Sequence, residues 1–383
     1  MRKLLSIFFI CIAFFANAYD FIVDGLCYNI DSDNTSAYIV SSNEHSNLTG
    51  EVIIPDYVLY NGNTYKVSEI SYNAFNGCTG ITSLTIGRNI STIRDYAFNG
   101  CTGLYKVIWN AENCYCRGPF NKLTNIEVFE FGENVEIIDE YLCEGLSNIT
   151  EITIPSSVKR IGYAAFQMCS GITNLNLSEG LEEIGKYSFS SCSGIQELYI
   201  PNSVDVIDDG AFMMCSAIDT LSIGNNVRVI GRSAFDMCTS LTKIVIPNSV
   251  YVIGEGAFWK NSSLKTLVIG EKVASIGETA FSNCSSLQDI ISLKKNAVPL
   301  PESAVEKVNI NPGCVLHVRK GSKMLYERQY IWNQFGSIVE DAEDYVDVGS
   351  GSSSNGVYGD VNGDGSVNAA DVTAIYNIIL GIE

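Results

Sequence analysis

The stretch ISYNAFNGCTGITSLTIG, residues 70–87, decides the fold, because close variants of it recur along the chain. Residues 207–224 read IDDGAFMMCSAIDTLSIG, and residues 253–270 read IGEGAFWKNSSLKTLVIG. Each variant carries an Ala-Phe pair, a Cys or Asn three residues later, and alternating apolar residues before a final Gly. Recurrence at a fixed period of roughly 20 to 50 residues is the signature of a solenoid. The register of this repeat therefore determines the architecture.

The Phe of the Ala-Phe pair marks each repeat, and we call this position the anchor. Successive anchors lie 23 residues apart, with a single interval of 22. The irregular repeat is the one at Phe120, where Tyr115 replaces the aliphatic residue that stands five positions before most other anchors. The ten anchors are Phe75, Phe98, Phe120, Cys143, Phe166, Phe189, Phe212, Phe235, Phe258 and Phe281.

Apolar residues nine and eleven positions after each anchor predict a short strand with two inward side chains. A Gly or Pro usually follows and ends the strand, since Pro cannot donate to a ladder. The rest of the repeat is expected to form the return path. One coil buries about five apolar side chains, each worth roughly 1.5–3 kcal/mol, which only neighbouring coils can cover. The sequence thus predicts a β-rich repeat solenoid of about ten 23-residue coils, with one parallel strand per coil.

A longer period of 46 residues overlies the first. Pro155, Pro201 and Pro247 end every second strand, and Ser178, Gly224 and Gly270 end the strands between them. We interpret this alternation as growth by duplication of coil pairs, and it carries no information about function.

Thirteen cysteines would ordinarily indicate disulfides in an exported protein. Seven of them instead recur three residues after an anchor, where parallel stacking keeps Cβ atoms near the ~4.8 Å strand spacing, wider than the ~3.8 Å of a disulfide. We therefore expect buried free thiols in the core. These seven are Cys78, Cys101, Cys169, Cys192, Cys215, Cys238 and Cys284.

The N-terminus is typical of a secretory signal peptide, residues 1–18. Arg2 and Lys3 precede an apolar run over residues 4–15, and Ala16-Asn17-Ala18 supplies small residues for cleavage. The alternative, a membrane anchor, is disfavoured because the run is too short to span a bilayer. The expected location is extracellular or at the cell surface, with no transmembrane segment after cleavage.

The repeats resemble the BspA-like leucine-rich repeats of bacterial surface proteins. The flanks GEVIIPDYVLYNGNTYKVSEI (50–70) and LHVRKGSKMLYERQYIWNQFGSIVE (316–340) share this resemblance, which covers roughly residues 21–340. It implies a leucine-rich-repeat solenoid. Members of that family are described as adhesins for host matrix proteins or other bacteria, so the resemblance also implies a binding role.

The domain boundaries follow from the repeat register. Residues 19–69 form a strand-rich N-terminal cap with a hairpin turn at Asn61-Gly62, and residues 70–292 form the solenoid. Residues 293–340 form a C-terminal cap, with a strand at 315–318 and a helix capped by Ser322. Residues 341–357 are a linker rich in Gly and Ser, and residues 358–383 form a separate module.

That module, GDVNGDGSVNAADVTAIYNIILG (359–381), has the spacing of an EF-hand calcium loop followed by a helix. The alternative is an Asp/Asn-rich turn without metal. The module resembles one dockerin type I repeat, and dockerins carry two repeats and bind cohesins. A cohesin-like partner is thereby implied, although a single repeat also suits pairing with another chain, a calcium-ordered tail or a remnant. The predicted calcium ligands are Asp360, Asn362, Asp364, the carbonyl of Ser366, and Asp371.

Outward residues eight and ten positions after each anchor form two columns along the strands. They are mixed, weakly charged and rich in Thr, Ser and Asn, which suits contact with an extracellular protein or a glycan. The alternative is that they are merely good strand formers facing water. The predicted contact residues are Asn174, Asn176, Glu197, Tyr199, Thr220, Ser222 and Lys243.

The amino-acid composition excludes several classes of function for this chain. A net charge of −19 without a Lys/Arg stripe excludes nucleic acid as a ligand. His45 and His317 are the only histidines, one in each cap, which excludes a histidine-based catalytic site inside the solenoid. A carboxylate pair needs only Asp and Glu, but regular coils offer no deep cleft. We therefore expect a non-enzymatic binding protein, with a component of a dockerin/cohesin-type assembly or polysaccharide-degrading complex, or an architectural spacer, as alternatives.

Overall fold

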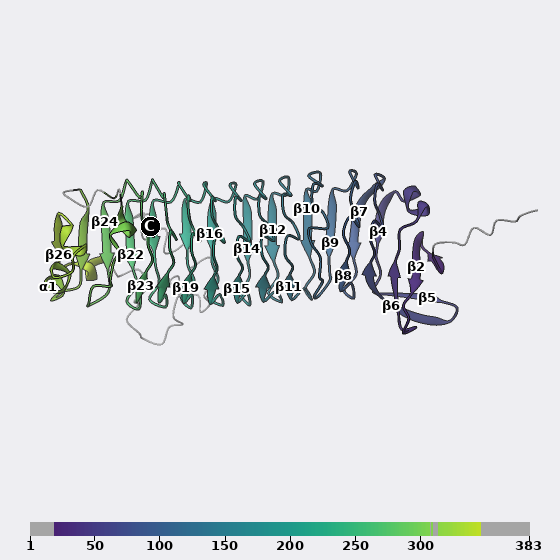
Figure 1. Ribbon diagram of the computed structural model, residues 1–383, viewed down its shortest axis with the longest axis horizontal. Helices are drawn as coiled ribbons and strands as arrows, with labels where there is room; N and C mark the ends of the chain where they lie inside the picture. Colours follow the sequence, from purple (N-terminus) through teal and green to yellow (C-terminus); the bar gives the residue numbers. More distant parts are fainter. Residues whose placement is uncertain (1–18, 307, 309–312, 346–383) are drawn as a thin grey trace, which may run out of the picture.

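The computed structural model describes residues 19–306, 308 and 313–345 and shows stacked coils forming a straight rod (Figure 1). The predicted signal peptide and calcium loop, and most of the predicted linker, lie outside the described residues. In the described part, no helix is long and apolar enough to cross a membrane.

The predicted strand forms in every coil, and together these strands build one wall of the rod, which we call the long wall. Where neighbouring strands pair, they are parallel, as in the pairing of Ile152 with Leu175. The strands are β7 (Ile81–Ile86), β9 (Lys106–Trp109), β10 (Val128–Phe131), β12 (Glu151–Ile154), β14 (Asn174–Leu177), β16 (Glu197–Tyr199), β18 (Thr220–Ser222), β20 (Lys243–Val245), β22 (Thr266–Ile269) and β24 (Asp289–Ser292). The ten predicted coils are confirmed. The wall also continues past them, through β4 (Gly50–Ile53) at one end and β25 (Val315–Val318) and β26 (Ser337–Val339) at the other.

A second parallel sheet, the short wall, lies where we expected only a return path. Its strands have two residues each, which is too short to produce an alternating pattern in the sequence. Near the N-terminus, β8 (Thr92–Ile93) pairs with β6 (Asn63–Ile70), and the irregular coil adds only a bridge between Thr92 and Tyr115. The continuous part contains β11 (Ile137–Ile138), β13 (Arg160–Ile161), β15 (Glu183–Ile184), β17 (Val206–Ile207), β19 (Val229–Ile230), β21 (Val252–Ile253) and β23 (Ser275–Ile276).

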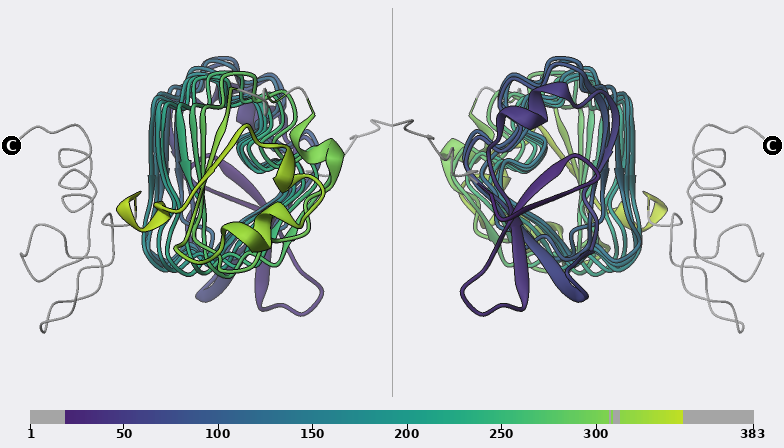
Figure 2. Two further views of the ribbon diagram at one scale, coloured as in Figure 1. Left: turned by 90° about the vertical axis from the view of Figure 1, so that its left-hand side faces the viewer. Right: turned by 90° about the vertical axis from the view of Figure 1, so that its right-hand side faces the viewer.

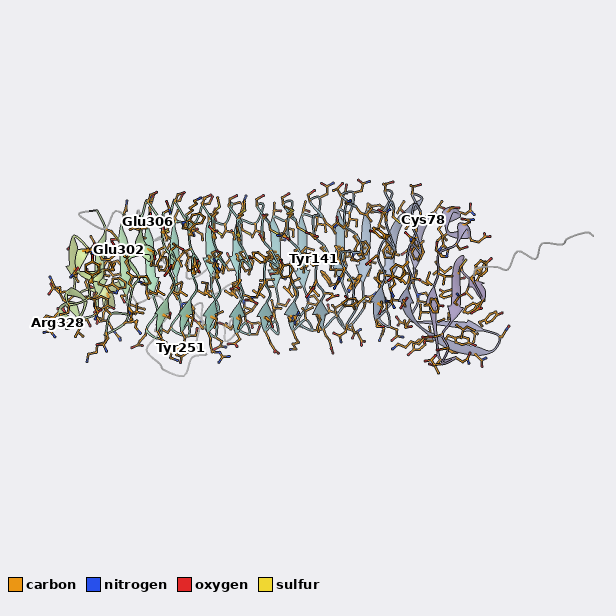
Figure 3. The ribbon with its side chains drawn as sticks, in the orientation of Figure 1. Cys78, Tyr141, Tyr251, Glu302, Glu306 and Arg328 are labelled. Carbon is orange, nitrogen blue, oxygen red and sulfur yellow. The ribbon has the colours of Figure 1, made fainter. Side chains whose placement is uncertain are left out.

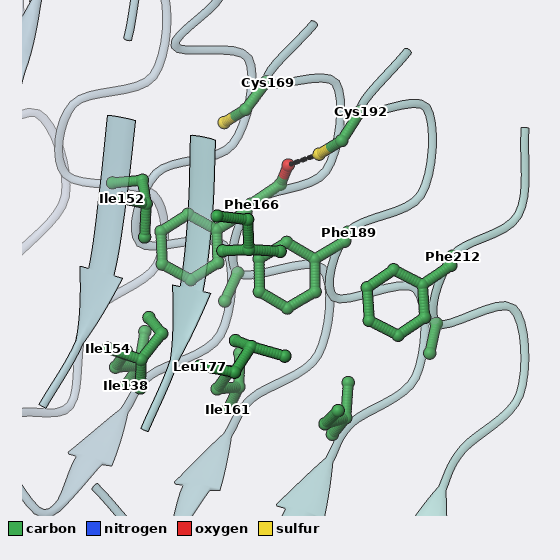
Figure 4. Close-up of a cluster of buried hydrophobic side chains, with 14 of the residues drawn as sticks. Ile138, Ile152, Ile154, Ile161, Phe166, Cys169, Leu177, Phe189, Cys192 and Phe212 are labelled. Carbon is green, nitrogen blue, oxygen red and sulfur yellow. Dashed lines mark hydrogen bonds between the residues drawn. The ribbon is translucent and has the colours of Figure 1, made fainter. Parts of the chain in front are cut away.

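The anchors stack along the core between the walls (Figure 4). The ring of Phe189 lies 5.0 Å from that of Phe166 and 5.3 Å from that of Phe212, and both pairs are parallel within 2°. The column lacks a ring at Cys143. There Phe131, from β10, supplies one instead, with its ring edge-on to Phe166 at 6.0 Å. Each ring covers the next, so the repeat period itself builds the core.

The twelve cysteines in the described part of the chain are free and buried. The Sγ of Cys192 donates to the carbonyl of Phe166 in the preceding coil at 3.0 Å (Figure 4). Asn261 takes the same position in its coil and donates from Nδ2 to the carbonyl of Phe235 at 2.9 Å. Burial raises the pKa of Cys215 to about 12. The position therefore selects a small buried side chain that also donates a hydrogen bond, a role the sequence analysis did not anticipate.

The N-terminal cap closes one end of the core. It contains β1 (Phe21–Val23), β2 (Leu26–Ile30), β3 (Ser36–Ile39), η1 (Asn43–Asn47), β5 (Tyr57–Tyr60) and β6 (Asn63–Ile70). Asn61 and Gly62 have φ of 50° and 80°, so the predicted hairpin turn between β5 and β6 is confirmed. This hairpin projects beyond the outline of the coils (Figure 2).

His45 takes the place of an anchor in this cap. Its ring stacks on that of Phe75 at 5.0 Å. The backbone N–H of Cys27 donates to Nε2 at 3.0 Å, so Nδ1 carries the proton and donates to the carbonyl of Ala74 at 2.7 Å. Burial lowers the pKa of His45. The residue is thus a neutral structural histidine.

The C-terminal cap contains η2 (Glu302–Val305), α1 (Lys323–Glu327) and η3 (Trp332–Gln334) besides β25 and β26. The strand over residues 315–318 is confirmed, and α1 begins directly after Ser322. The prediction that Ser322 caps this helix is wrong. Its backbone is already helical (φ −102°, ψ −17°), and its hydroxyl is buried without a hydrogen-bond partner.

The chain after β26 folds back onto the outside of the long wall. In η4 (Ala342–Tyr345), Ala342 is fully buried against Val268 and Ile291. Asp341, just before η4, lies 2.7 Å from Nδ1 of His317 on β25. Figure 2 shows this turn outside the coils. The packed structure therefore continues through residue 345, into the segment predicted as linker.

Candidate binding face

The predicted contact residues lie side by side on the outer surface of the long wall. The side chain of Asn174 is exposed, as is that of Asn176, whereas Leu175 between them points into the core. This alternation follows from the pleat of the strand. The structure places Asn174 and Asn176 on β14, Glu197 and Tyr199 on β16, Thr220 and Ser222 on β18, and Lys243 on β20.

The backbone ladder of the long wall is interrupted at three junctions, which we call seams. In the described structure no ladder joins β10 to β12, β14 to β16, or β18 to β20. Each seam comes immediately before a strand that ends at Pro155, Pro201 or Pro247. The 46-residue period of the sequence is therefore the period of the seams.

A proline, which has no backbone N–H, stands twelve positions after the anchor at each seam. In several coils without proline the residue at this position donates to the preceding coil, although Gly224 and Gly270 make no such bond where the strands are joined. Ser178 bonds the carbonyl of Ile154 at 3.3 Å, and Gly132 bonds that of Trp109 at 2.9 Å. Pro201 occupies the same position and has no hydrogen to donate. The backbone hydrogen bond from this position is therefore absent at each seam.

The seams also change how well the inward side chains are covered. Leu175 and Leu177, on the strand before the middle seam, are 7% and 8% exposed. Their counterparts Ile152 and Ile154, one coil earlier, are both 0% exposed. Ile223, before the next seam, is 8% exposed. The strand that precedes a seam is thus less completely buried than the strand that follows one.

A hollow of about 440 Å³ lies over the middle seam. Four of the seven predicted contact residues line it, while Thr220, Ser222 and Lys243 do not. The inward-facing Leu175 contributes to it as well. The lining residues are Glu151, Thr153, Thr173, Asn174, Leu175, Asn176, Gln196, Glu197 and Tyr199.

The hollow is polar and acidic, and its lining contains neither Lys nor Arg. Asn174 Nδ2 donates to Glu151 Oε1 at 3.3 Å, and the Tyr199 hydroxyl donates to Glu197 Oε2 at 2.9 Å. These bonds link neighbouring side chains and fix their orientation. Such a surface presents both donors and acceptors to a ligand.

The open face ends before the last coils. Val268 and Ile291 continue the outward column, but they are only 7% and 0% exposed because Ala342 covers them. The sequence analysis treated this column as outward along its whole length, and that expectation is wrong for these two coils. The C-terminal segment covers the end of the wall because its own apolar side chain needs burial.

Neither histidine belongs to the hollow. His45 is bonded to backbone groups in the N-terminal cap, and His317 lies between Asp341 and Asp289, whose Oδ1 is 3.2 Å from Nε2. Among the described residues, no group of three or more His, Cys, Asp or Glu side chains is arranged to hold a metal ion.

A second surface was missed in the sequence. Tyrosines two or three positions before the anchors form a stripe along the arc beside the short wall. The ring of Tyr163 lies 5.2 Å from that of Tyr141 and 5.7 Å from that of Tyr187. Tyr141 is labelled midway along the rod in Figure 3. The recurrence of Tyr two or three positions before the anchors could have indicated this stripe from the sequence.

The coils and their caps define a leucine-rich-repeat solenoid with an open strand face. The chain belongs to the family described as BspA type leucine rich repeat region (6 copies), whose overlapping matches cover residues 63–173, 112–238, 162–288 and 205–311. Residues 350–383 match the dockerin type I domain. No curated protein matches the chain.

Solved structures similar to this chain include bacterial leucine-rich-repeat proteins. One from Bacteroides ovatus ATCC 8483 is 22% identical, with a TM-score of 0.52 over 85% of this chain and 79% of that chain. A leucine rich cell surface protein from Faecalibacterium prausnitzii A2-165 is 23% identical, with a TM-score of 0.36 over 71% of this chain and 94% of that chain.

The two family matches indicate the general class of function of the chain. Proteins with such repeats are generally non-catalytic, and together with dockerin domains they are typical of extracellular or surface proteins. Dockerin type I domains typically bind calcium and imply a cohesin-type partner. A leucine-rich-repeat protein with a dockerin domain is consistent with a binding or scaffold role.

Proposed function

We propose that the protein is a secreted or cell-surface, adhesin-like binding protein without catalytic activity. Its long wall contacts an extracellular ligand, which is a host protein, a bacterial partner or a glycan. The observation that carries this proposal is the polar hollow on the open strand face, which gathers Asn174, Asn176, Glu197 and Tyr199 in one place. The signal peptide predicted over residues 1–18 supports the location.

Tyr199 and Asn176 provide the test of the face. We expect Tyr199→Ala and Asn176→Ala to weaken binding to a ligand found among fibronectin, fibrinogen and arrayed glycans, because both side chains line the hollow. Ser83→Ala, on the same wall in the first coil, is the matched control and should bind like the wild type. If both hollow variants bound every detected ligand unchanged, the proposal for this face would fail.

A second candidate function follows from the dockerin match. In it the protein is a non-enzymatic component of a cohesin-based extracellular assembly or polysaccharide-degrading complex. The predicted ligands Asp360, Asn362, Asp364, Ser366 and Asp371 all fall inside the matched residues 350–383. Their oxygen atoms are the hard donors that calcium prefers.

Calcium titration of the full chain tests this module. We expect the wild type to release or absorb heat on binding calcium, and Asp364→Ala to lose this signal because one carboxylate ligand is removed. Capture of a cohesin-bearing protein should then require calcium. A wild-type chain that gave no heat at millimolar calcium would contradict the predicted loop.

A further inference from the structure

We propose that the hollow over the β14/β16 seam is a subsite for a neutral oligosaccharide lying along the rod axis. This inference rests on the proposed function, that the long wall binds an extracellular ligand, and names the chemical class of that ligand.

The hollow lies at a junction of the repeat marked by Pro201, which has no backbone N–H to donate across it. No ladder joins β16 to β14 there, and the floor of the hollow includes Leu175, whose side chain is otherwise inward. At the first seam, Glu130 on β10 pairs with Lys106 at 2.9 Å. After the third seam, the outward position of β20 holds the long, half-buried Lys243. At the middle seam the position equivalent to Glu130 holds the short, neutral Asn176, and the position equivalent to Lys243 holds Glu197.

Anionic ligands are disfavoured by the charge of the lining. Glu151 and Glu197 are both present and neither Lys nor Arg is. A phosphate, a sulfate or a uronic acid would meet two carboxylates without a compensating cation, which is repulsive at contact distance.

A single cationic group fits poorly as well. Glu151 and Glu197 stand at equivalent positions two coils apart, about 10 Å at the ~4.8 Å spacing of strands. One ammonium or guanidinium group therefore reaches only one of them. Each carboxylate also accepts a hydrogen bond already, from Asn174 and Tyr199 respectively.

A ligand with a chain of hydroxyl groups suits a lining that is acidic and whose two carboxylates are too far apart for one cation. Hydroxyls both donate and accept, and three successive coils offer amide, hydroxyl and carboxylate groups at the strand spacing, including those of Thr153, Asn176 and Glu197. Leu175 and Tyr199 add apolar surface for the C–H faces of sugar rings. The hollow is open along the wall, so a linear oligosaccharide can extend across several coils.

Calorimetry with the full chain tests the ligand class. The neutral probes are cellohexaose, mannohexaose and maltohexaose, and the charged probes are hexagalacturonate and hexalysine. We expect at least one neutral probe to bind and Asn176→Ala to weaken that binding about tenfold, the effect of a lost pair of hydrogen bonds. Absence of binding by all three neutral probes at millimolar concentration, or stronger binding of a charged probe, overturns the inference.

Closing the seam is the sharper test. Pro201→Ser restores the N–H that Ser178 supplies one coil earlier, so it should draw β16 to β14 and reduce oligosaccharide binding at least tenfold. Pro247→Ser closes the next seam and should leave binding unchanged. Equal effects of the two variants overturn the role of the seam. If host proteins bind the wall while the sugars do not, only the ligand class fails; if no ligand depends on the wall, the proposed function fails too.

Discussion

The two walls of the rod are made from the same coils, yet they differ in continuity. The short wall runs unbroken from β11 to β23, past the second and third seams, while the long wall loses its ladder at every second junction between β10 and β20. The short wall keeps an N–H at each pairing position, and the column of anchors and thiols beside it repeats in every coil. At the second and third seams, the short wall and the anchor column join the coils where the long wall lacks a ladder. The candidate binding hollow lies at one of these seams, between β14 and β16.

The largest effect on stability is expected in the stacked column of anchor rings. Phe212→Ala should lower the free energy of unfolding by about 3–5 kcal/mol, because its ring is stacked on both sides and leaves a cavity when removed. Urea denaturation followed by circular dichroism measures this. Tyr105→Ala, at a side chain 48% exposed, is the control and should cost under about 0.5 kcal/mol. Similar losses in both variants would show that the stacked column does not dominate stability.

A smaller effect is expected beside the same column, at Asp236. Its side chain is 3% exposed, its Oδ1 has no hydrogen-bond partner, and burial raises its pKa to about 6. The folded protein therefore holds this proton more tightly than the unfolded chain, and stability falls as the pH rises from about 4 to about 6.

Asp236→Asn should accordingly stabilise the protein by about 2 kcal/mol at pH 8 and by almost nothing at pH 4. Thermal denaturation at the two pH values measures the difference. The exposed Asp219→Asn serves as control and should shift neither value by more than about 0.5 kcal/mol. A gain at pH 4 equal to that at pH 8 would contradict the buried charge as its cause.

The smallest effect separates paired from unpaired junctions of the long wall. Backbone amides at the β14/β16 seam should exchange with solvent faster than those at the β12/β14 junction, because a ladder protects only the latter. Pro201→Ser should slow exchange at the seam roughly fivefold, the value of one hydrogen bond of about 1 kcal/mol. Hydrogen-exchange mass spectrometry measures both. Equal protection of amides at the two junctions in the wild type would contradict the absence of a ladder between β14 and β16.

The double repeat shows why sequence and structure had to be combined. Pro201 and Gly224 were visible as alternating strand ends, but their meaning depends on the neighbouring coil. A Cβ at Gly224 would lie 2.2 Å from the carbonyl oxygen of Pro201, so only glycine fits beside that proline. The alternation therefore reflects how neighbouring coils contact each other.

The sequence by itself determined the solenoid, its coil register, the inward strand residues and the buried thiols, because a fixed period forces equivalent residues to stack. It also predicts a calcium loop over residues 360–371, because the ligand spacing of such a loop is local to one short stretch of chain. Only the tertiary structure decided the short wall, the hydrogen bonds of the thiols, the folding back of residues 341–345 and the seams. Each of these features depends on which groups of one coil contact those of the next. The repeat period in the sequence does not specify these contacts.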